Sequence, residues 1–282
     1  MPENSSDIQF IRRALKEDTG KGDITTGALG LKGRKGSAIV IAKSRGIISG
    51  VEQFKLLFKI LSPNVRFKSG VKNGGRVLPG DEVMGIIGPL DALLTGERTA
   101  MNILSHLSGV ATLTAKFVEC VNKFPVQILD TRKTMPGMRT WEKAAVKHGG
   151  GTNHRYGLYD MYLIKENHVA AVSGMLNALE KIQKHNLKTG LKIEVEVRDI
   201  SELKLVLAYK PDYILLDNFT PSELKTAIKL ARLKSKKIVL EASGNINLKN
   251  IIRVAASGVD RISIGALTHS APALDLSFRI LD

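Results

Sequence analysis

Short apolar runs rich in β-branched residues recur through the second half of the chain, and each ends in a polar or small residue. Most are separated by stretches with helical periodicity, such as residues 201–208, 222–233 and 247–256. This alternation predicts an α/β fold with a parallel sheet, either a barrel or a doubly wound sheet. The predicted strands are residues 126–130, 161–165, 193–197, 213–217, 238–243 and 261–265.

The polar residues that end these runs favour the barrel, because barrel enzymes place their chemistry at the carboxyl ends of the strands. Six or seven strand–helix units fit here, fewer than the eight of a complete barrel. The predicted fold is therefore an incomplete (six- or seven-stranded) α/β barrel. Ser201 and Ser222, each followed by an acid, are expected to be N-caps of two of its helices.

The first half of the chain mixes short strands with a few helices, which predicts an N-terminal α+β domain. Its predicted elements are helices at 7–17 and 52–60, a loop at 18–26, and strands at 37–42, 46–51, 65–68 and 82–88.

A long helical stretch at 91–122, either one helix or two that break near Gly109, is expected to bridge two domains. We place the N-terminal domain at residues 1–110 and the barrel at residues 111–269. Residues 270–282 are expected to pack back on the N-terminal domain.

Composition limits the class of protein. The chain has 282 residues, of which 43% are apolar, enough for a sizeable core. The single cysteine, Cys120, cannot form an internal disulfide, which indicates a reducing compartment. The polar N-terminus has no apolar secretion segment, and no apolar run approaches the ~20 residues of a membrane span. We therefore expect a cytoplasmic protein without membrane contact.

The formal net charge of +15 allows two interpretations. One is a nucleic-acid-binding protein, and the other is an enzyme for small polyanions. The lysines are scattered, and the sequence has neither a basic stripe interleaved with aromatics nor zinc-finger spacing. We therefore favour the enzyme and expect no nucleic-acid partner.

Seven cationic or imidazole side chains lie close together in sequence, among glycines and at the ends of apolar runs. Cations at strand ends and tight turns can converge on one pocket, which would suit a ligand with several negative charges. Arg suits the planar, bidentate gripping of carboxylates. The seven are Arg132, Lys133, Arg139, His154, Arg155, Lys165 and His168.

Acidic residues also mark the strand ends. Glu194 and Glu196 lie two apart in one strand and point to the same side. They are either structural ion pairs with lysines, or Glu196, nearer the strand end, binds sugar hydroxyls or orients a metal. Asp217 ends a wholly apolar strand and has the same two interpretations, with the functional one stronger.

Two glycine turns close the last two strands: residues 243–245 (Ser-Gly-Asn) and 264–266 (Ile-Gly-Ala). Small residues at strand-to-helix turns let backbone N–H groups approach a phosphate, and barrels often bind phosphate at their last two loops. His269 is expected either to touch this phosphate or to lie on the surface. Residues 149–151 are not a P-loop, because the following Lys-Ser/Thr is missing.

Several motifs together resemble the quinolinate phosphoribosyltransferase family nearly end to end. They are residues 22–25 (Gly-Asp-Ile-Thr), the helical segment 95–109, 130–134 (Asp-Thr-Arg-Lys-Thr), 149–155 (Gly-Gly-Gly with His-Arg), 164–168 (Ile-Lys-Glu-Asn-His), 194–197 (Glu-Val-Glu-Val), 216–218 (Leu-Asp-Asn), 241–246 (Glu-Ala-Ser-Gly-Asn-Ile) and 263–269 (Ser-Ile-Gly-Ala-Leu-Thr-His).

The resemblance implies an N-terminal α/β sandwich domain, an incomplete barrel, dimers or larger assemblies, and a requirement for Mg²⁺. The implied reaction transfers a phosphoribosyl group from phosphoribosyl pyrophosphate to quinolinate with decarboxylation. Its products are nicotinate mononucleotide, CO₂ and pyrophosphate, in NAD biosynthesis. A paralogous protein associated with molybdate transport is the nearest alternative, and the intact motifs at 130–134 and 164–168 favour the quinolinate enzyme.

The resemblance also implies residue roles. Glu196 and Asp217 would hold the ribose hydroxyls and Mg²⁺, although the family's acid could align with Glu194. Arg98 would enter the pocket from a neighbouring subunit. Lys133 and Lys165, with the two acids, are the implied catalytic residues. The implied quinolinate-binding residues are Thr131, Arg132, Lys133, His154, Arg155 and Lys165, and the implied 5′-phosphate site comprises Ser243, Gly244, Asn245, Ile264, Gly265, Ala266 and His269.

Overall fold

A computed structural model describes residues 5–68 and 70–281. The chain divides into two compact units. The first, the N-terminal unit, comprises Met1–Ala115, Met135–Gly150 and Ala271–Asp282; the second, the barrel unit, comprises Lys116–Thr134 and Gly151–Ser270.

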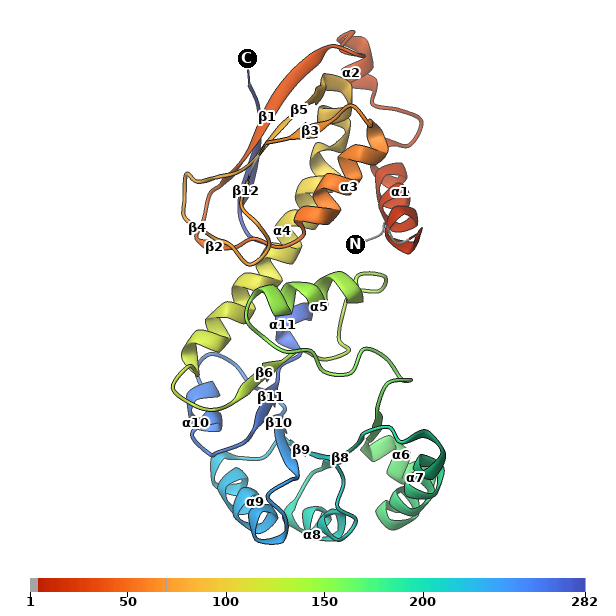
Figure 1. The fold of residues 1–282 in the computed structure, drawn as a ribbon, viewed down its shortest axis with the longest axis vertical. Coiled ribbons are helices and arrows are strands. Elements are labelled where there is room, and N and C mark those ends of the chain that lie inside the picture. The colour runs from red at the N-terminus through yellow and green to blue at the C-terminus, as the bar shows by residue number, and fades with distance from the viewer. Residues whose placement is uncertain (1–4, 69, 282) are drawn as a thin grey trace. The chain divides into compact units, whose positions relative to one another are not determined.

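The N-terminal unit contains a four-stranded antiparallel sheet in the order β12-β1-β5-β3 (Figure 1). Its strands are β1 (Lys35–Ala42), β3 (Arg66–Phe67), β5 (Glu82–Pro89) and β12 (Leu276–Leu281). β2 (Gly46–Ile47) and β4 (Arg76–Val77) form a separate short pair. Because β12 pairs with β1, the C-terminal segment of the chain completes the sheet begun near the N-terminus.

Helices pack on this sheet through aromatic and aliphatic side chains. Phe58 of α3 (Val51–Leu61) stacks on Phe278 of β12 at 6.2 Å between ring centroids. The other helices of the unit are α1 (Ser5–Thr19), α2 (Ile24–Ala28), α5 (Arg139–His148) and most of α4 (Leu90–Cys120). The predicted long helical stretch is one continuous helix, α4.

The predicted loop at 18–26 is wrong over its last residues, because α2 begins at Ile24. Asp23 caps this helix: one carboxylate oxygen accepts the Thr26 N–H at 3.0 Å, and the other accepts the Thr26 hydroxyl at 2.6 Å. Helix α2 has only five residues, too few to show helical periodicity among turn-forming residues, and the Asp23 cap stabilises its start.

Residues 135–150 group with the N-terminal unit although they lie inside the stretch 111–269 in sequence. Trp141 packs edge-on against Phe10 with ring centroids 4.9 Å apart. The buried carboxylate of Glu142 lies 2.7 Å from Nε2 of His106, and Nδ1 of His148 lies 2.8 Å from the Ser49 hydroxyl. Contacts to α1, α4 and the β2 region therefore hold α5 in this unit.

The barrel unit contains a six-stranded parallel sheet in the order β6-β11-β10-β9-β8-β7 (Figure 1). Every predicted strand of the second half is confirmed. β6 and β7 occupy the two ends of the sheet, so the barrel is incomplete. The strands are β6 (Gln127–Leu129), β7 (Tyr162–Ile164), β8 (Ile193–Val197), β9 (Tyr213–Asp217), β10 (Val239–Ser243) and β11 (Arg261–Ser263).

Helices follow five of these strands, and α8 and α9 pack side by side (Figure 1). The predicted N-caps at Ser201 and Ser222 are wrong by two residues. The Asp199 side chain caps α8 by accepting the N–H groups of Ser201 and Glu202. The Thr220 side chain caps α9 by accepting the N–H group of Glu223. These helices are α6 (Glu166–Ala171), α7 (Met175–Thr189), α8 (Ile200–Ala208), α9 (Pro221–Lys234), α10 (Ile251–Ala255) and α11 (Ala266–His269).

Gly109→Ala should lower the free energy of unfolding by about 2 kcal/mol, since a β-carbon there would lie 2.2 Å from the carbonyl oxygen of Pro272. Gly27→Ala is the matched control. It lies within α2 with no atom inside 4 Å of the new β-carbon, so we expect a neutral effect or a gain of about 0.5–1 kcal/mol. Urea denaturation measures both, and equal stability of the two variants would contradict the close approach of α4 to Pro272.

Candidate active site

The carboxyl ends of the six parallel strands meet at one edge of the barrel unit, which we call the barrel mouth. The register places Asp217 opposite Ser243, at the last residues of β9 and β10. Lys165 follows β7 directly as the N-cap residue of α6. The barrel mouth comprises residues 130–133, 155, 165, 196, 217, 243–245, 264–266 and 269.

Glu196 and Lys165 form the closest ion pair at the barrel mouth. Nζ of Lys165 lies 2.5 Å from Oε2 of Glu196, whose side chain is buried. Burial, a hydrogen bond with Glu166 and the negative charge of Asp217 together raise the pKa of Glu196 to about 7, against the effect of Lys165. Glu196 and Asp217 are thus close enough to repel, so a cation or hydroxyl donor between them would be stabilised.

Two guanidinium groups mark the cationic side. Arg155 is buried, and its Nη1 donates to the carbonyl of Met161 at 3.0 Å. Its Nε has no hydrogen-bond partner among the described residues. Burial and repulsion from the exposed Arg132 lower the pKa of Arg155. An anionic group that contacts both guanidinium groups would relieve this repulsion and satisfy Nε.

The first glycine turn requires its glycine. Gly244 has φ +94°, and a β-carbon there would lie 2.2 Å from Oδ1 of Asn218. The same Asn218 oxygen accepts a hydrogen bond from Nδ2 of Asn245 at 3.1 Å, and Asn245 itself has φ +51°. The Asn218 side chain therefore packs against Gly244, and only glycine leaves room for it.

The second glycine turn lies beside a cationic side chain. A β-carbon at Gly265 would lie 3.0 Å from Cδ of Lys133 and 3.2 Å from the ring of His269. The hydroxyl of Thr268 donates to the carbonyl of Lys133 at 2.6 Å, which ties the loop after β6 to α11. Lys133, His269 and this turn, predicted separately from the sequence, therefore lie together.

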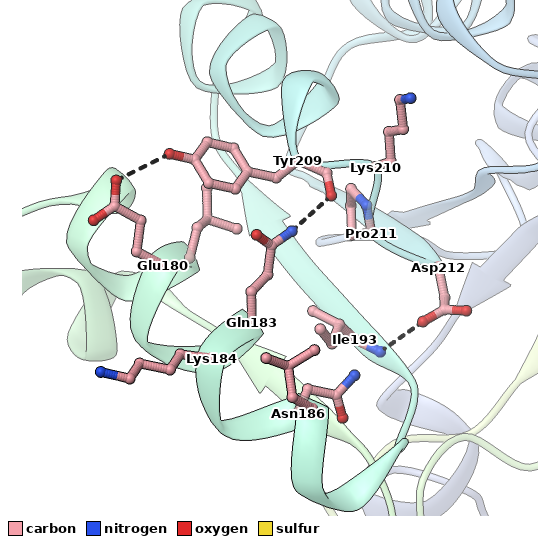
Figure 2. A pocket seen from close by; sticks show the side chains of 11 residues that line it. Glu180, Gln183, Lys184, Asn186, Ile193, Tyr209, Lys210, Pro211 and Asp212 are labelled. Carbon is pink, nitrogen blue, oxygen red and sulfur yellow. Dashed lines mark hydrogen bonds between the residues drawn. The ribbon is translucent and has the colours of Figure 1, made fainter.

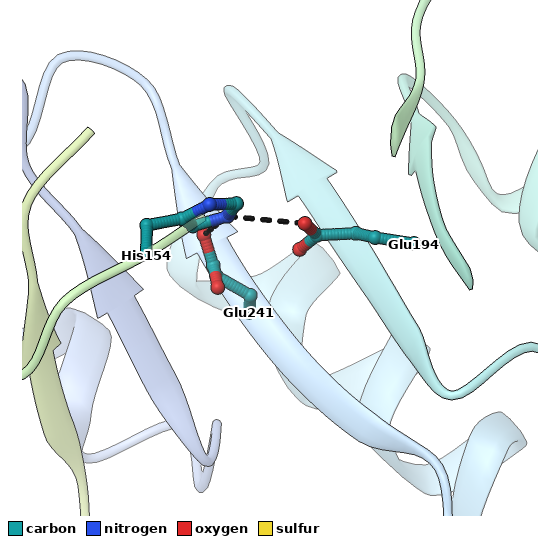
Figure 3. Close-up of side chains that lie close together, drawn as sticks. All are labelled: His154, Glu194 and Glu241. Carbon is teal, nitrogen blue, oxygen red and sulfur yellow. Dashed lines mark ion pairs between the residues drawn. The ribbon is translucent and has the colours of Figure 1, made fainter. Parts of the chain in front are cut away.

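His154 is placed differently from the other predicted residues. Its side chain is only 8% exposed and points into the barrel unit between two acids (Figure 3). Nε2 lies 3.0 Å from Oε2 of Glu194 and 3.3 Å from Oε1 of Glu241. The prediction from the loop alone, a ring that grips a ligand, did not anticipate these partners, because they come from β8 and β10.

The protonation of this cluster follows from its geometry. Burial opposes a charge on His154, but the Glu194 and Glu241 carboxylates beside Nε2 raise the pKa of His154 to about 10. Burial and repulsion from Glu241 raise the pKa of Glu194. The amide of Arg155 donates to Nδ1 of His154 at 2.8 Å, so in this geometry the ring proton lies on Nε2. This bond opposes the second ring proton that the two neighbouring acids favour.

The same three residues have the composition of a metal site, with ligand atoms within 4.8 Å of one another. A metal bound at Nε2 of His154 would need the ring proton to move to Nδ1, where the Arg155 N–H already donates. The cluster therefore fits a network of hydrogen bonds and charge better than a cation. Glu241 was missed in the sequence; the available signal was an acid inside the apolar run at 238–242.

Arg98 belongs to the N-terminal unit, on α4. Its side chain is 69% exposed and reaches no acid closer than Glu97, at 4.0 Å, among the described residues of that unit. It lines a hollow of about 350 Å³ together with residues of α1 and α4, among them Phe10 and His106. The guanidinium is therefore available to a ligand or to another chain.

A larger cavity of about 580 Å³ lies between α7 and the segment 209–212 of the barrel unit (Figure 2). Ile193 begins β8 and Asp212 precedes β9, so this cavity lies at the amino ends of the strands. Gln183 donates to the carbonyl of Tyr209 at 2.9 Å across it. It contains none of the predicted site residues, and the barrel mouth remains the candidate active site.

Comparison with known proteins covers nearly the whole chain. Residues 110–279 match the family model described as quinolinate phosphoribosyl transferase, C-terminal domain, and residues 23–108 match its N-terminal domain. No helix within residues 5–68 and 70–281 combines the length and apolarity needed to span a membrane.

Individual relatives agree with the family models. The chain is 39% identical to the nicotinate-nucleotide pyrophosphorylase (carboxylating) of Mycobacterium leprae, over 96% of this chain and 98% of the relative. It is 37% identical to the chloroplastic enzyme of that name from Arabidopsis thaliana, over 96% and 81%. The solved structure of the nicotinate-nucleotide pyrophosphorylase from Francisella tularensis superposes with a TM-score of 0.91 at 37% identity, over 99% and 98%.

Glu196→Gln should raise the melting temperature at pH 8. The folded pKa of about 7 exceeds the ordinary value of 4.5, so the folded state binds this proton more tightly than the unfolded chain does. Stability therefore falls as pH rises from about 4.5 to 7, and the penalty remains above pH 7. A neutral amide avoids roughly 1–3 kcal/mol of it at pH 8.

Thermal unfolding at pH 5 and pH 8 provides the measurement, and most of the difference should vanish at pH 5. Glu180→Gln, an exposed acid of the same unit, is the control and should show no such pH dependence. A Glu196→Gln protein less stable than the wild type at pH 8 would contradict the raised pKa.

Proposed function

This chain belongs to the quinolinate phosphoribosyltransferase family, and we propose how its barrel mouth performs the family's reaction. The predicted activity is confirmed by these matches: the chain is a pentosyltransferase that converts quinolinate and phosphoribosyl pyrophosphate to nicotinate mononucleotide in NAD biosynthesis. The residue roles below, the Mg²⁺ and the oligomer are our proposals.

The quinolinate pocket consists of the cations at the barrel mouth. Arg132 and Arg155 bind the two carboxylates, and Lys133 and Lys165 complete the cationic wall; Thr131 shapes the loop by accepting the Lys133 N–H at 3.0 Å. The observation that carries this assignment is the buried Arg155 guanidinium, whose Nε has no hydrogen-bond partner among the described residues. Burial and the nearby Arg132 also lower the pKa of Arg155. Two guanidinium groups that lie close enough to repel each other suit a dianionic substrate.

Phosphoribosyl pyrophosphate binds on the acidic side. Glu196 and Asp217 hold the ribose hydroxyls, while turns 243–245 and 264–266, with His269, hold the 5′-phosphate. Backbone amides at such turns bind phosphate without a side chain. The closeness of Lys133 to Gly265 supports a phosphate there.

Mg²⁺ fits the same acids. It prefers oxygen ligands and usually binds one or two carboxylates together with substrate phosphates. Glu196 and Asp217 offer such oxygens, and their mutual repulsion, which helps to raise the pKa of Glu196, favours a cation. When bound, the ion would neutralise negative charge on the pyrophosphate.

The protein contributes position and charge to the transfer. The pyridine nitrogen attacks the anomeric carbon as pyrophosphate leaves, so the sugar becomes positive and the leaving group negative. Glu196 and Asp217 stabilise the sugar, and Lys133 and Lys165 stabilise the leaving group, each contact contributing on the order of a few kcal/mol. Cleavage of the bond between the ring carbon and the adjacent carboxylate then releases CO₂ and leaves the electron pair on that carbon, where the neighbouring positive ring nitrogen stabilises it. A proton from water then binds this carbon, so the step needs a proton source and no general base.

The assembly is a homodimer or a multiple of dimers in which Arg98 of one subunit enters the pocket of another. Its exposed guanidinium on α4 is available for this role. A second subunit would then be part of every active site, and the isolated chain would lack one quinolinate contact. Cytoplasmic localisation stays a prediction.

Arg132→Ala should abolish quinolinate binding and leave phosphoribosyl pyrophosphate binding largely intact, because it removes only a carboxylate contact.

Asp217→Asn is the reciprocal variant: turnover should fall more than quinolinate affinity. Calorimetric titration with each substrate and CO₂ release in the presence of Mg²⁺ measure these effects. Equal loss of both substrates in folded Arg132→Ala would contradict the pocket, and unchanged turnover in Asp217→Asn would exclude this acid from the mechanism.

Arg98→Ala and Lys165→Ala should each be nearly inactive alone, and mixing them should restore activity. A mixed dimer has one intact site and one doubly altered site, so random exchange restores about a quarter of wild-type activity. Subunits are mixed under mild denaturation, refolded and assayed for CO₂ release. A mixture of Lys133→Ala with Lys165→Ala is the control and should remain inactive. Failure of the first pair to recover would place Arg98 outside the neighbouring active site.

A further inference from the structure

The loop between α5 and β7 carries Arg155 and lies beside the edge strand β6. Thr152 makes an isolated parallel bridge to Leu129 of β6. Asp130, buried at the end of β6, accepts the His154 N–H at 2.9 Å and Nδ2 of Asn153 at 2.6 Å. The start of the loop is therefore tied to the barrel by its backbone, although residues 153–161 form neither helix nor strand.

A second attachment comes from the ring of His154. Figure 3 shows the imidazole reaching from the loop to the acids of β8 and β10. Nε2 contacts Glu194 at 3.0 Å and Glu241 at 3.3 Å, and the two carboxylates are about 1% and 0% exposed. Three chain segments far apart in sequence thus meet at one ring nitrogen.

The other ring nitrogen faces Arg155. Nδ1 of His154 accepts the Arg155 N–H at 2.8 Å, so the orientation of the ring sets the position of the Arg155 backbone. The Arg155 side chain leaves this point and donates from Nη1 to Met161 at 3.0 Å. Both ends of the Arg155 side chain are therefore fixed relative to the sheet.

Burying two carboxylates inside a barrel costs desolvation free energy. Replacing a buried ion pair by apolar side chains of similar volume is often neutral or stabilising, so packing alone does not explain Glu194 and Glu241. We propose that Glu194 and Glu241 are positioning residues for quinolinate: they clamp the His154 ring, and the ring fixes the backbone of Arg155. The proposal rests on the quinolinate contact assigned to Arg155 above.

Glu194→Met keeps the side-chain volume and removes the contact to Nε2. We expect the KM for quinolinate to rise about tenfold while the KM for phosphoribosyl pyrophosphate stays unchanged. Only Arg155, the proposed quinolinate contact, would lose the fixed His154 ring that positions its backbone. Glu194→Gln retains an acceptor for Nε2–H and should recover to within about threefold of wild type. Glu180→Met, an exposed acid of the same unit, should leave both constants unchanged.

A purely structural role predicts a different result, namely a lower melting temperature with both KM values raised together. That result overturns the proposal, as does a wild-type KM for quinolinate in Glu194→Met. If Glu194→Met does not fold, Glu241→Met replaces it because it also removes an acceptor for Nε2–H. The same selective rise in the quinolinate KM is expected, and an unchanged KM overturns the proposal.

A double-mutant cycle with Arg155→Lys tests the connection itself. If Glu194 acts through Arg155, the effects of Glu194→Met and Arg155→Lys on the quinolinate KM are strongly non-additive. Additive effects overturn the proposal that Glu194 acts on quinolinate through Arg155, while Arg155 itself stays a residue of the pocket. An unchanged quinolinate KM in Arg155→Lys removes Arg155 from the pocket and overturns the proposal at its premise.

Discussion

The burial of two carboxylates on one strand is the constraint on which the barrel unit depends. Every residue of β8 is buried, including Glu194 and Glu196, and both acids point to the same side. A buried carboxylate needs a partner, because desolvation costs several kcal/mol when it is unpaired. Glu194 finds His154 from the loop before β7, and Glu196 finds Lys165 from the end of β7.

These two ion pairs lie at different positions along β8. The inner pair lies inside the sheet and holds the loop that carries Arg155. The outer pair lies at the barrel mouth, where Lys165 is 44% exposed and can reach a ligand. Because side chains alternate along a strand, two acids spaced by one residue share a face, and each pairs there with a different basic side chain.

Like charges lie close together at the barrel mouth. Arg155 and Arg132 repel each other, and Glu196 has a pKa raised to about 7 by burial and nearby acids. Such unfavourable charge is tolerated where a ligand of opposite charge relieves it, so binding free energy offsets a strain already present in the free protein. The N-terminal unit contrasts with this, since its core is formed by aliphatic packing and by Phe54, Phe58 and Phe278.

The sequence by itself determined the parallel strands and the polar residues at their carboxyl ends, where we propose the site, because apolar runs and the residues that end them are local properties. It also indicated that Arg132, Arg155 and Lys165 belong together, since each follows a strand or a glycine turn. Tertiary structure decided what depends on distant partners. The inward direction of His154 and the role of Glu241 follow from contacts among β8, β10 and a loop. Likewise, α5 belongs to the N-terminal unit because it contacts Phe10 and His106. The periodicity of one segment shows that it has an apolar face but not which distant residues cover that face.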